Sequence, residues 1–486
     1  MSASDKPTVL IVGAGLGGLM LGALLEKSGV PYTIFERAQV VKHLGSAMAI
    51  GPAVFPIFQQ LGIYEEVLAI SKPFHHVYNF METPWGLHFI KAGHFGLVEE
   101  LSGYGYNLVA RPKLYELLLK QVPAHKIHFG KRVLNVVEKD NKVIAHLPDN
   151  ETFEGDIVVG ADGAHSSVRQ RMYDSMERKG VLPKSDREDL PFDSICLVGQ
   201  TKVLDPKKFP VIALPYAHFT QIIGRAQPYS WHTFVTAQNT MCFMVVEHLP
   251  KQTSRAAMEK ATYDGKSTEW TFHPVETMMN ETRHFPIPIG NGKEGTLGDL
   301  YDQTNKDLIS KVMLEDKVFK TWHHGRCVLM GDACHKLSPA GGHGAVTALH
   351  DAVALANLLY AMPAKNSKDI TKLFEEYHKE RYPAVMESYT TSKRLAKTAQ
   401  RGIIGTILLY FSLYMPLFLW RYVMSTTVKF RPQAGFLQPV ELMGTVKPAV
   451  SLSEKKARTS LEHYRTSLEQ YRPSIDKRRD TGSVAI

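Results

Sequence analysis

Cysteine is scarce in this chain of 486 residues. Its four thiols, Cys196, Cys242, Cys327 and Cys334, form no C-x-x-C pair and show no metal-ligand spacing with histidine. These absences argue against a disulfide framework or a zinc site and suit a reducing compartment. The first residues, MSASDKP, lack the charged start and apolar core of a signal peptide. We therefore expect a cytoplasmic catalytic domain without a structural metal.

The sequence also lacks a carboxylate pair, a Ser-His-Asp arrangement or a cysteine in a recognisable catalytic context. With 44% hydrophobic and 22% charged residues, the composition is that of a globular protein with two domains or one large interleaved domain. Much of the net charge of +9 comes from residues 455–479, which predicts a solvated basic tail over residues 431–486. We expect no nucleic-acid partner.

The first organised stretch is VLIVGAGLGGLMLGALLEKSGVPYTIFER, residues 9–37. An apolar run, a glycine turn, a helical segment and a second apolar run predict a βαβ unit. Gly13, Gly15 and Gly18 form G-x-G-x-x-G directly after the first strand, and Glu36 ends the second strand. This arrangement is typical of a dinucleotide site, with the acid placed to accept hydrogen bonds from a ribose. Arg37 leaves open whether the nucleotide is FAD, NAD or NADP, since a cation there also suits a 2′-phosphate.

Three later stretches distinguish these cofactors. DIVVGADGAHSSVRQRM contains Asp162 after an apolar strand, GRCVLMGDACHKLSPAGGHGAV contains Asp332 after another, and VARPKLYELLL contains Arg111. Taken in chain order, with Arg111 first, Asp162 second and Asp332 third, the motifs resemble those of single-component flavoprotein monooxygenases, the family typified by para-hydroxybenzoate hydroxylase. The resemblance extends from residue 8 to about residue 390. It implies an α/β fold with a Rossmann-like FAD-binding domain, an interleaved antiparallel β-sheet substrate domain and C-terminal helices.

The same resemblance implies tightly bound FAD, with NADPH or NADH as a transient reductant that needs no second dinucleotide motif. Asp332 is expected to accept hydrogen bonds from the ribityl chain, and the following glycines to place a helix N-terminus against the flavin ring. The predicted FAD-binding residues are Gly13, Gly15, Gly18, Glu36, Arg37, Arg111, Asp162, Asp332, Pro339, Gly342, Gly344 and Ala345. Arg169 is a further candidate. His343 and Val346 stand where the family usually has glutamine and asparagine, and His343 either replaces the glutamine or is solvated or paired with backbone.

The predicted organisation has five parts. Residues 1–183 and 321–400 form the FAD-binding domain, 184–320 the substrate-binding sheet, 401–430 a hydrophobic membrane-associating segment, and 431–486 the basic tail. Aromatic and polar residues on the sheet are candidates for substrate contacts or for ordinary packing: Tyr216, His218, Arg225, Tyr229, Trp231, His232 and Met244.

Residues 403–420, IIGTILLYFSLYMPLFLW, form an uncharged apolar run that just reaches the length of a membrane span. Three alternatives remain: a helix or hairpin lying in one leaflet, which we favour, a spanning anchor, and a helix docked on the protein. We predict a membrane-associated monooxygenase that uses FAD, NAD(P)H and O2 to hydroxylate or epoxidise a lipophilic aromatic or isoprenoid-type substrate. The alternatives are an FAD-dependent oxidoreductase that inserts no oxygen and a non-catalytic flavin-binding protein.

Overall fold

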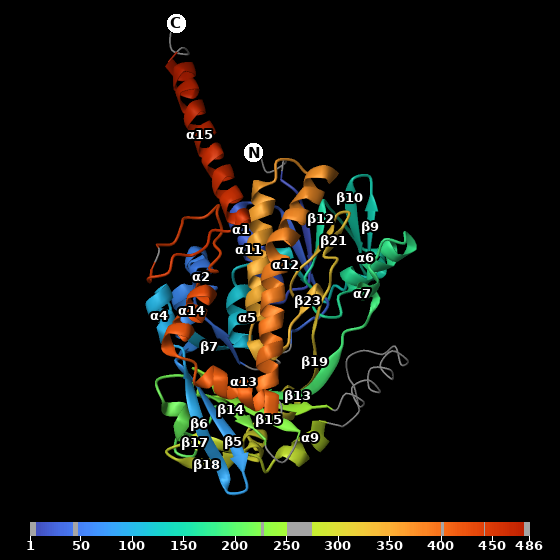
Figure 1. Cartoon of the computed structure of the whole chain (residues 1–486). Helices are drawn as coiled ribbons and strands as arrows, with labels where there is room; N and C mark the ends of the chain where they lie inside the picture. The colour runs from blue at the N-terminus through green and yellow to red at the C-terminus, as the bar shows by residue number, and fades with distance from the viewer. Residues whose placement is uncertain are drawn as a thin grey trace.

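A six-stranded, mostly parallel sheet forms the upper half of the molecule in Figure 1. The structure, a computed structural model, describes residues 6–41, 47–224, 228–249, 275–399, 403–441 and 443–480. The strand order is β21-β22-β12-β1-β2-β8, and only β21 runs antiparallel to its neighbour. The bounds are β1 Val9–Val12, β2 Tyr32–Glu36, β8 Ile127–Phe129, β12 Ile157–Gly160, β21 His323–His324 and β22 Cys327–Leu329.

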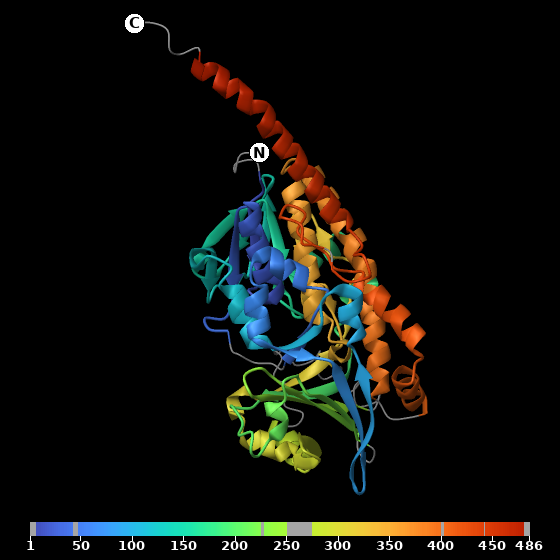
Figure 2. The same cartoon turned by 90° about the vertical axis from the view of Figure 1, so that its left-hand side faces the viewer.

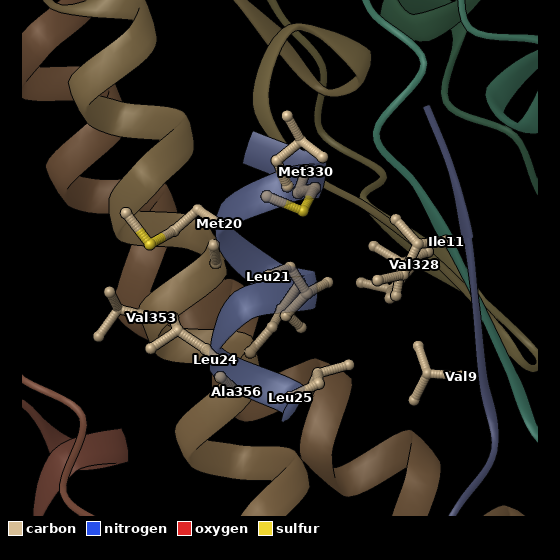
Figure 3. Close-up of a cluster of buried hydrophobic side chains, with 14 of the residues drawn as sticks. Val9, Ile11, Met20, Leu21, Leu24, Leu25, Val328, Met330, Val353 and Ala356 are labelled. Carbon is tan, nitrogen blue, oxygen red and sulfur yellow. The ribbon is translucent and has the colours of Figure 1, made fainter. Parts of the chain in front are cut away.

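Two helices cover this sheet closely. Helix α1 (Leu16–Ser28) lies between the sheet and α11 (Gly344–Ala361), and Figure 3 shows its leucines and Met20 between strands β1 and β22 on one side and Val353 on the other. The helices approach closely because Gly17 has no side chain, and a Cβ built there would lie 3.3 Å from the Cβ of Ala348. Strands β1 and β12 are buried on both faces. The face away from α1 is covered by a three-stranded sheet of β9 (Asn135–Lys139), β10 (Lys142–His146) and β11 (Thr152–Gly155), where Phe153 contacts Phe35 of β2.

The second large sheet has seven strands in the order β19-β13-β16-β15-β14-β5-β6. Strands β13 (Phe192–Gln200), β14 (Phe219–Ile223), β15 (Tyr229–Val235), β16 (Met241–His248) and β19 (Ser310–Glu315) come from the expected substrate region. Strands β5 (His76–Thr83) and β6 (Gly86–His94) come from within residues 1–183, and β5 pairs with β14 in parallel. The β5–β6 hairpin extends the sheet beyond β14, which would otherwise be an exposed edge strand. The predicted α/β architecture with an interleaved antiparallel sheet is confirmed.

The two faces of the seven-stranded sheet pack against different parts of the molecule. One face packs on a core of its own with α9 (Val275–Thr282) and α10 (Leu297–Asp302). The other face turns toward a small sheet of β3 (Ala47–Ile50), β7 (Tyr106–Ala110) and β4 (Ser71–Phe74), where Phe234 shares a cluster with Phe74 and Leu108. This second face therefore lies toward the half of the molecule that contains the parallel sheet.

The C-terminal part does not form the solvated tail that its charge suggests. Ala434 and Ala457 are fully buried, and the Asn357 side chain of α11 donates to the Gln433 carbonyl and accepts from the Gly435 N–H. Helix α15 (Leu452–Asp480) packs its first turns on α11 before it leaves the body of the protein (Figure 1). The prediction is wrong for residues 431–457 because small and apolar residues between the charges pack against α11. We call residues 431–437 the C-terminal strap.

The apolar run forms two short helices, α13 (Ile403–Leu413) and α14 (Leu417–Val428), whose axes are bent by 94° at the break between them. Helix α14 packs on α4 (Leu97–Ser102) through Met424 and Val428, and α13 contacts β6 and α12 (Ser367–Thr398). Within the described ranges, the one unbroken helix long and apolar enough to span a membrane is α11, and 72% of it is buried in the protein. Of the three alternatives, docking on the protein therefore holds for the inner side of this helix pair.

Candidate functional site

Four of the predicted nucleotide-binding residues lie at the carboxyl ends of four neighbouring strands of the parallel sheet. Asp332 lies after β22, Asp162 after β12, Gly13 after β1, and Glu36 at the end of β2. These strands are adjacent and parallel, so their carboxyl ends meet along one edge in that order. Open α/β sheets bind their ligands at this edge.

The glycines of the first motif have different surroundings. Gly13 adopts a φ of 108°, and a Cβ there would lie 2.4 Å from the Ala161 carbonyl oxygen. A Cβ at Gly18 would lie only 2.0 Å from the Gly13 oxygen. Gly15 is exposed, and a Cβ added there would meet no atom within 4 Å. Gly13 and Gly18 are therefore needed for packing, whereas Gly15 faces open space at the N-terminus of α1, where N–H groups favour an anion.

Glu36 is held at the end of β2 by two backbone donors. Its carboxylate accepts the Ala14 N–H at 3.0 Å and the Ala38 N–H at 2.9 Å. Nearby, the buried hydroxyl of Tyr115 has no hydrogen-bond partner in the described structure. Burial, with the charge of Glu36 adding to it, raises the pKa of Tyr115 to about 12. A buried hydroxyl without a partner near the Glu36 carboxylate fits a site that holds a polar ligand, as the prediction of a dinucleotide site requires.

Helix α5 (Arg111–Leu119) presents Arg111 at its first residue. Tyr115 follows four residues later, so both lie on one face of the helix. Arg111 and Arg37 are exposed, as cations that meet a phosphate from solvent would be. Arg111 therefore lies on the same face of α5 as the unpaired Tyr115 hydroxyl, which is near Glu36.

Asp162 caps the following helix, α6 (Ser167–Arg178). Its carboxylate accepts the Ser167 N–H at 2.7 Å and the Ser166 hydroxyl at 2.5 Å. Arg169, on α6, is buried and donates to the carbonyls of Ala164 at 2.6 Å and Ala333 at 2.7 Å. Arg169 therefore joins the loop after β12 to the loop after β22, a role that sequence reasoning did not identify.

Asp332 is paired in the structure with Lys336, whose ammonium donates to Asp332 Oδ2 at 2.6 Å. Lys336 also belongs to a local excess of positive charge. Burial lowers the pKa of His165, and the charges of Arg169, Lys336 and Arg37 lower it further. Cations gathered between the motifs suit the diphosphate of a dinucleotide.

The glycine-rich stretch after Asp332 leads into α11 through a short turn, Pro339–Gly341. Pro339 and Gly342 are exposed, and Gly342 has a φ of 65°. Built Cβ atoms at Gly342 and Gly344 meet no atom within 4 Å, so the backbone before the helix borders open space. Ala345 is half-buried and packs against the main core. This leaves room for a flat ring beside the N-terminus of α11.

His343 lies between these glycines but faces α12. Its Nδ1 is 3.5 Å from the hydroxyl of Ser392, which is fully buried. Burial lowers the pKa of His343, while a backbone contact with Ser388 opposes that shift. The contact with the Ser388 backbone agrees with the interpretation of a backbone-paired histidine.

The candidate substrate residues divide between the two faces of the seven-stranded sheet. Tyr229 and Trp231 belong to the sheet's own core, where the indole donates to the Pro286 carbonyl and both rings contact Phe285. Because alternate residues of a strand face opposite sides, Tyr229 and Trp231 share the face that packs on this core, and they are packing residues.

His232 and Met244 are paired across β15 and β16 on the other face, toward the nucleotide-binding half. Phe219 lies beside this pair, with its ring centroid 6.1 Å from that of His232. His218 stacks on Tyr78 at 4.2 Å, and Tyr216 forms a hydrogen bond with Tyr78. Arg225 lies outside the described residues.

Comparison with known proteins identifies the family. The chain matches the model of a family described as an FAD binding domain over residues 6–203 and 300–392. It is 28% identical over 411 residues to the FAD-dependent monooxygenase paxM of Penicillium paxilli, covering 82% of this chain and 80% of that protein. It is also 28% identical over 422 residues to the FAD-dependent monooxygenase ptmM of Penicillium ochrochloron, covering 83% of this chain and 92% of that protein.

Solved structures share the fold. HpxO of Klebsiella pneumoniae, complexed with FAD and uric acid, has a TM-score of 0.63 at 18% identity, covering 87% of this chain and 96% of that chain. CtdE, in complex with FAD and a substrate, has a TM-score of 0.63 at 16% identity, covering 87% and 98%. Because the family model matches more than half of the sequence, the chain belongs to the FAD binding domain family, and its predicted place among the FAD-dependent monooxygenases is confirmed.

Proposed function

We propose that this protein is an FAD-dependent monooxygenase that uses NADPH or NADH and O2 to hydroxylate or epoxidise a lipophilic aromatic or isoprenoid-type substrate. The observation that carries the proposal is the line of Asp332, Asp162, Gly13 and Glu36 along the carboxyl edge of the parallel sheet. Open space borders this edge at Gly15, Gly342 and Gly344. When bound, the flavin accepts a hydride from the nicotinamide and activates O2 for transfer to substrate.

The residues have distinct proposed roles toward FAD. Glu36 binds the adenosine ribose, Arg111 and the N-terminus of α1 bind the diphosphate, and Asp332 binds the ribityl hydroxyls. The N-terminus of α11, with Gly344 as its first residue, stabilises negative charge on the ring after reduction. Asp162 acts through the loop and helix that it caps.

The substrate is proposed to lie between the flavin ring and the sheet face that carries Phe219, Met244 and His232. Phe219 and Phe234 contact each other at 4.4 Å between ring centroids and give this wall an apolar part that suits a lipophilic substrate. His232 is a polar group on this wall, opposite Gln221 of β14, and its Nδ1 has no partner among the described residues. Burial lowers the pKa of His232 to about 4, so it is neutral at pH 7 and available as a hydrogen-bond partner for one oxygen of the substrate.

Isotope labelling distinguishes this function from the alternatives. The enzyme is incubated with NADPH, an extract of lipophilic candidate substrates and ¹⁸O2, and products are analysed by mass spectrometry. A monooxygenase gives a product heavier by one ¹⁸O atom. A product that is oxidised or reduced without the label would instead establish an oxidoreductase that inserts no oxygen.

Membrane association forms the second part of the proposal: the helix pair α13–α14 lies in one leaflet. Each helix is about 16–18 Å long, against about 30 Å for the hydrocarbon core, so neither spans a bilayer alone. The outer side of the pair carries large apolar side chains that are each more than half exposed: Ile403, Ile407, Phe411, Tyr414, Leu417, Phe418 and Tyr422. Figure 2 shows the pair on the outer side of the molecule, level with the junction between its upper and lower halves.

Basic residues surround this apolar surface. Arg394, Lys397 and Lys429 are exposed next to the two helices, and Lys91 lies 4.2 Å from the centre of the Tyr414 ring. An apolar patch edged by cations suits a leaflet that contains anionic lipids. Such a surface would also concentrate lipophilic substrate near the enzyme.

Vesicle sedimentation tests this association with matched variants. We expect the double change Ile407→Asn and Phe418→Asn to release the protein from vesicles of phosphatidylcholine and phosphatidylserine while its fold is retained. Val40→Asn changes an equally exposed apolar residue outside the helix pair and should leave binding intact. Unchanged binding of the double variant would rule out this surface.

A further inference from the structure

Asp351 is a fully buried carboxylate two turns inside α11, directly behind the loop that carries Asp332. Its Oδ2 accepts the Gly331 N–H at 2.9 Å and the His335 Nε2–H at 2.6 Å. Its Oδ1 accepts the Arg381 Nε–H at 2.8 Å. One carboxylate thus joins three segments: the loop of residues 331–335, helix α11 and helix α12.

Stability alone gives no reason for this arrangement. Asp351, His335 and Arg381 are each at most 1% exposed, and burying charges costs solvation free energy that their attraction often only balances. Well-packed apolar residues of similar volume are frequently as stabilising. A buried ionic group does, however, fix the relative positions of the segments that it joins, because the hydrogen bonds are directional.

The group is also not a metal site in its present form. Cys334 Sγ lies with ligand atoms of His335 and Asp351 within 4.8 Å of one another. Both oxygens of Asp351 already accept hydrogen bonds, and the Arg381 guanidinium supplies the positive charge that a cation would bring. The geometry is therefore that of an ion pair extended by a histidine.

The contact with Gly331 links this group to the proposed flavin site. Gly331 has a φ of 59°, and its N–H points inward to Asp351, while the next side chain, Asp332, is about one third exposed. A Cβ at Gly331 would lie 3.1 Å from the Cβ of Ala348 on α11. Asp351 thereby sets how closely the Asp332 loop approaches the N-terminal turns of α11.

We propose that Asp351 is a positioning residue for the flavin site, acting through the Gly331 N–H and with His335 and Arg381 as its partners. It holds Asp332, which binds the ribityl chain, at a fixed distance from the N-terminus of α11, which faces the ring. Asp351 itself touches no part of the flavin. The inference rests on the proposed function, since it concerns the site assigned there to FAD.

The test measures FAD binding and flavin electronics separately from stability. Asp351→Asn keeps the size of the side chain but removes its charge. We expect the dissociation constant for FAD, measured by quenching of flavin fluorescence with apoprotein, to rise by about tenfold or more, the loss expected for one hydrogen bond to a charged group. The reduction potential of bound FAD should also shift, because the N-terminus of α11 is displaced from the ring.

Asn357→Ala is the matched control. Asn357 is fully buried on the same helix and makes two hydrogen bonds, but its partners lie in the C-terminal strap. This variant should lower the unfolding temperature while the dissociation constant and the reduction potential stay at wild-type values. If Asp351→Asn does not fold, His335→Gln replaces it, with a smaller change expected in the same direction.

Asp332→Ala, measured in parallel, distinguishes failure of the positioning role from failure of the proposed FAD site. If Asp332→Ala weakens FAD binding and Asp351→Asn, or His335→Gln in its place, leaves both readouts at wild-type values, the positioning role is refuted and the proposed site stands. If Asp332→Ala itself binds FAD normally, the assignment of the site fails and the positioning role fails with it.

Discussion

Gly15 is the N-cap of α1 and Gly18 lies in its first turn, but their surroundings are opposite, so replacing each with alanine separates packing from ligand binding. A Cβ at Gly18 would lie 2.0 Å from the Gly13 oxygen, and contacts below 3.0 Å essentially never occur, so α1 must move by about 1 Å. Overpacking of this kind costs about 1–3 kcal/mol. We expect Gly18→Ala to lower the free energy of unfolding of the apoprotein by at least that amount.

Gly15→Ala should leave the apoprotein almost unchanged. The residue has a φ of −72°, which alanine adopts without strain, and the new methyl group meets open space. Alanine is a weaker N-cap than glycine by about 0.5 kcal/mol, and the reduced entropy of the unfolded chain offsets this by about 0.4–1 kcal/mol. The net effect on unfolding is therefore within about 0.5 kcal/mol.

We expect Gly15→Ala to weaken FAD binding, although it leaves the stability of the apoprotein almost unchanged. If the diphosphate lies against Gly15, the methyl group of Gly15→Ala occupies its place, and a clash of about 1–3 kcal/mol weakens binding roughly five- to 150-fold. Urea unfolding of the apoprotein and titration with FAD measure the two quantities independently. A Gly15→Ala variant that binds FAD as tightly as the wild type would refute the placement of the diphosphate.

Two further predictions concern the whole fold. Truncation after residue 430 removes the buried side chain of Phe436 and both hydrogen-bond partners of Asn357, at a cost of about 3–6 kcal/mol. The truncated protein should therefore aggregate, or unfold at a much lower temperature than the full chain in a thermal scan. An unfolding temperature equal to that of the full chain would contradict the role of the strap. Burial lowers the pKa of His232 to about 4 and that of His350 to about 3 from 6.5, so the unfolded chain binds protons first as pH falls. The free energy of unfolding should therefore decrease between pH about 6.5 and 4, by up to about 1.4 kcal/mol per pH unit for each histidine, and a profile in urea unfolding that stays flat over this range would contradict their burial.

The parts of the fold with a strong local pattern were predictable from the sequence. The βαβ unit around Gly13, Gly15 and Gly18 follows from the alternation of an apolar strand, a glycine turn and a helix, and the strands before Asp162 and Asp332 are continuous apolar runs. Strand order was not predictable in this way. It depends on pairing between residues more than a hundred positions apart, as when β1 lies next to β12.

The interactions that sequence reasoning missed are those between distant segments. Arg169 contacts the loop after β22, and Arg381 reaches Asp351 from a different helix. Neither pairing has a local signature. The C-terminal strap was predicted to be solvated for a related reason. The charged residues that follow it dominate the composition, whereas Ala434 within it is fully buried.

The central claim is that FAD binds at the carboxyl edge of the parallel sheet, where it is reduced by a nicotinamide cofactor and reoxidised by O2. Its most direct test is the absorbance spectrum of the purified protein, loaded with FAD and followed without oxygen through addition of NADPH and then in air. The account predicts flavin bands that bleach with NADPH and return with uptake of O2. A protein that stays colourless after incubation with FAD would contradict it.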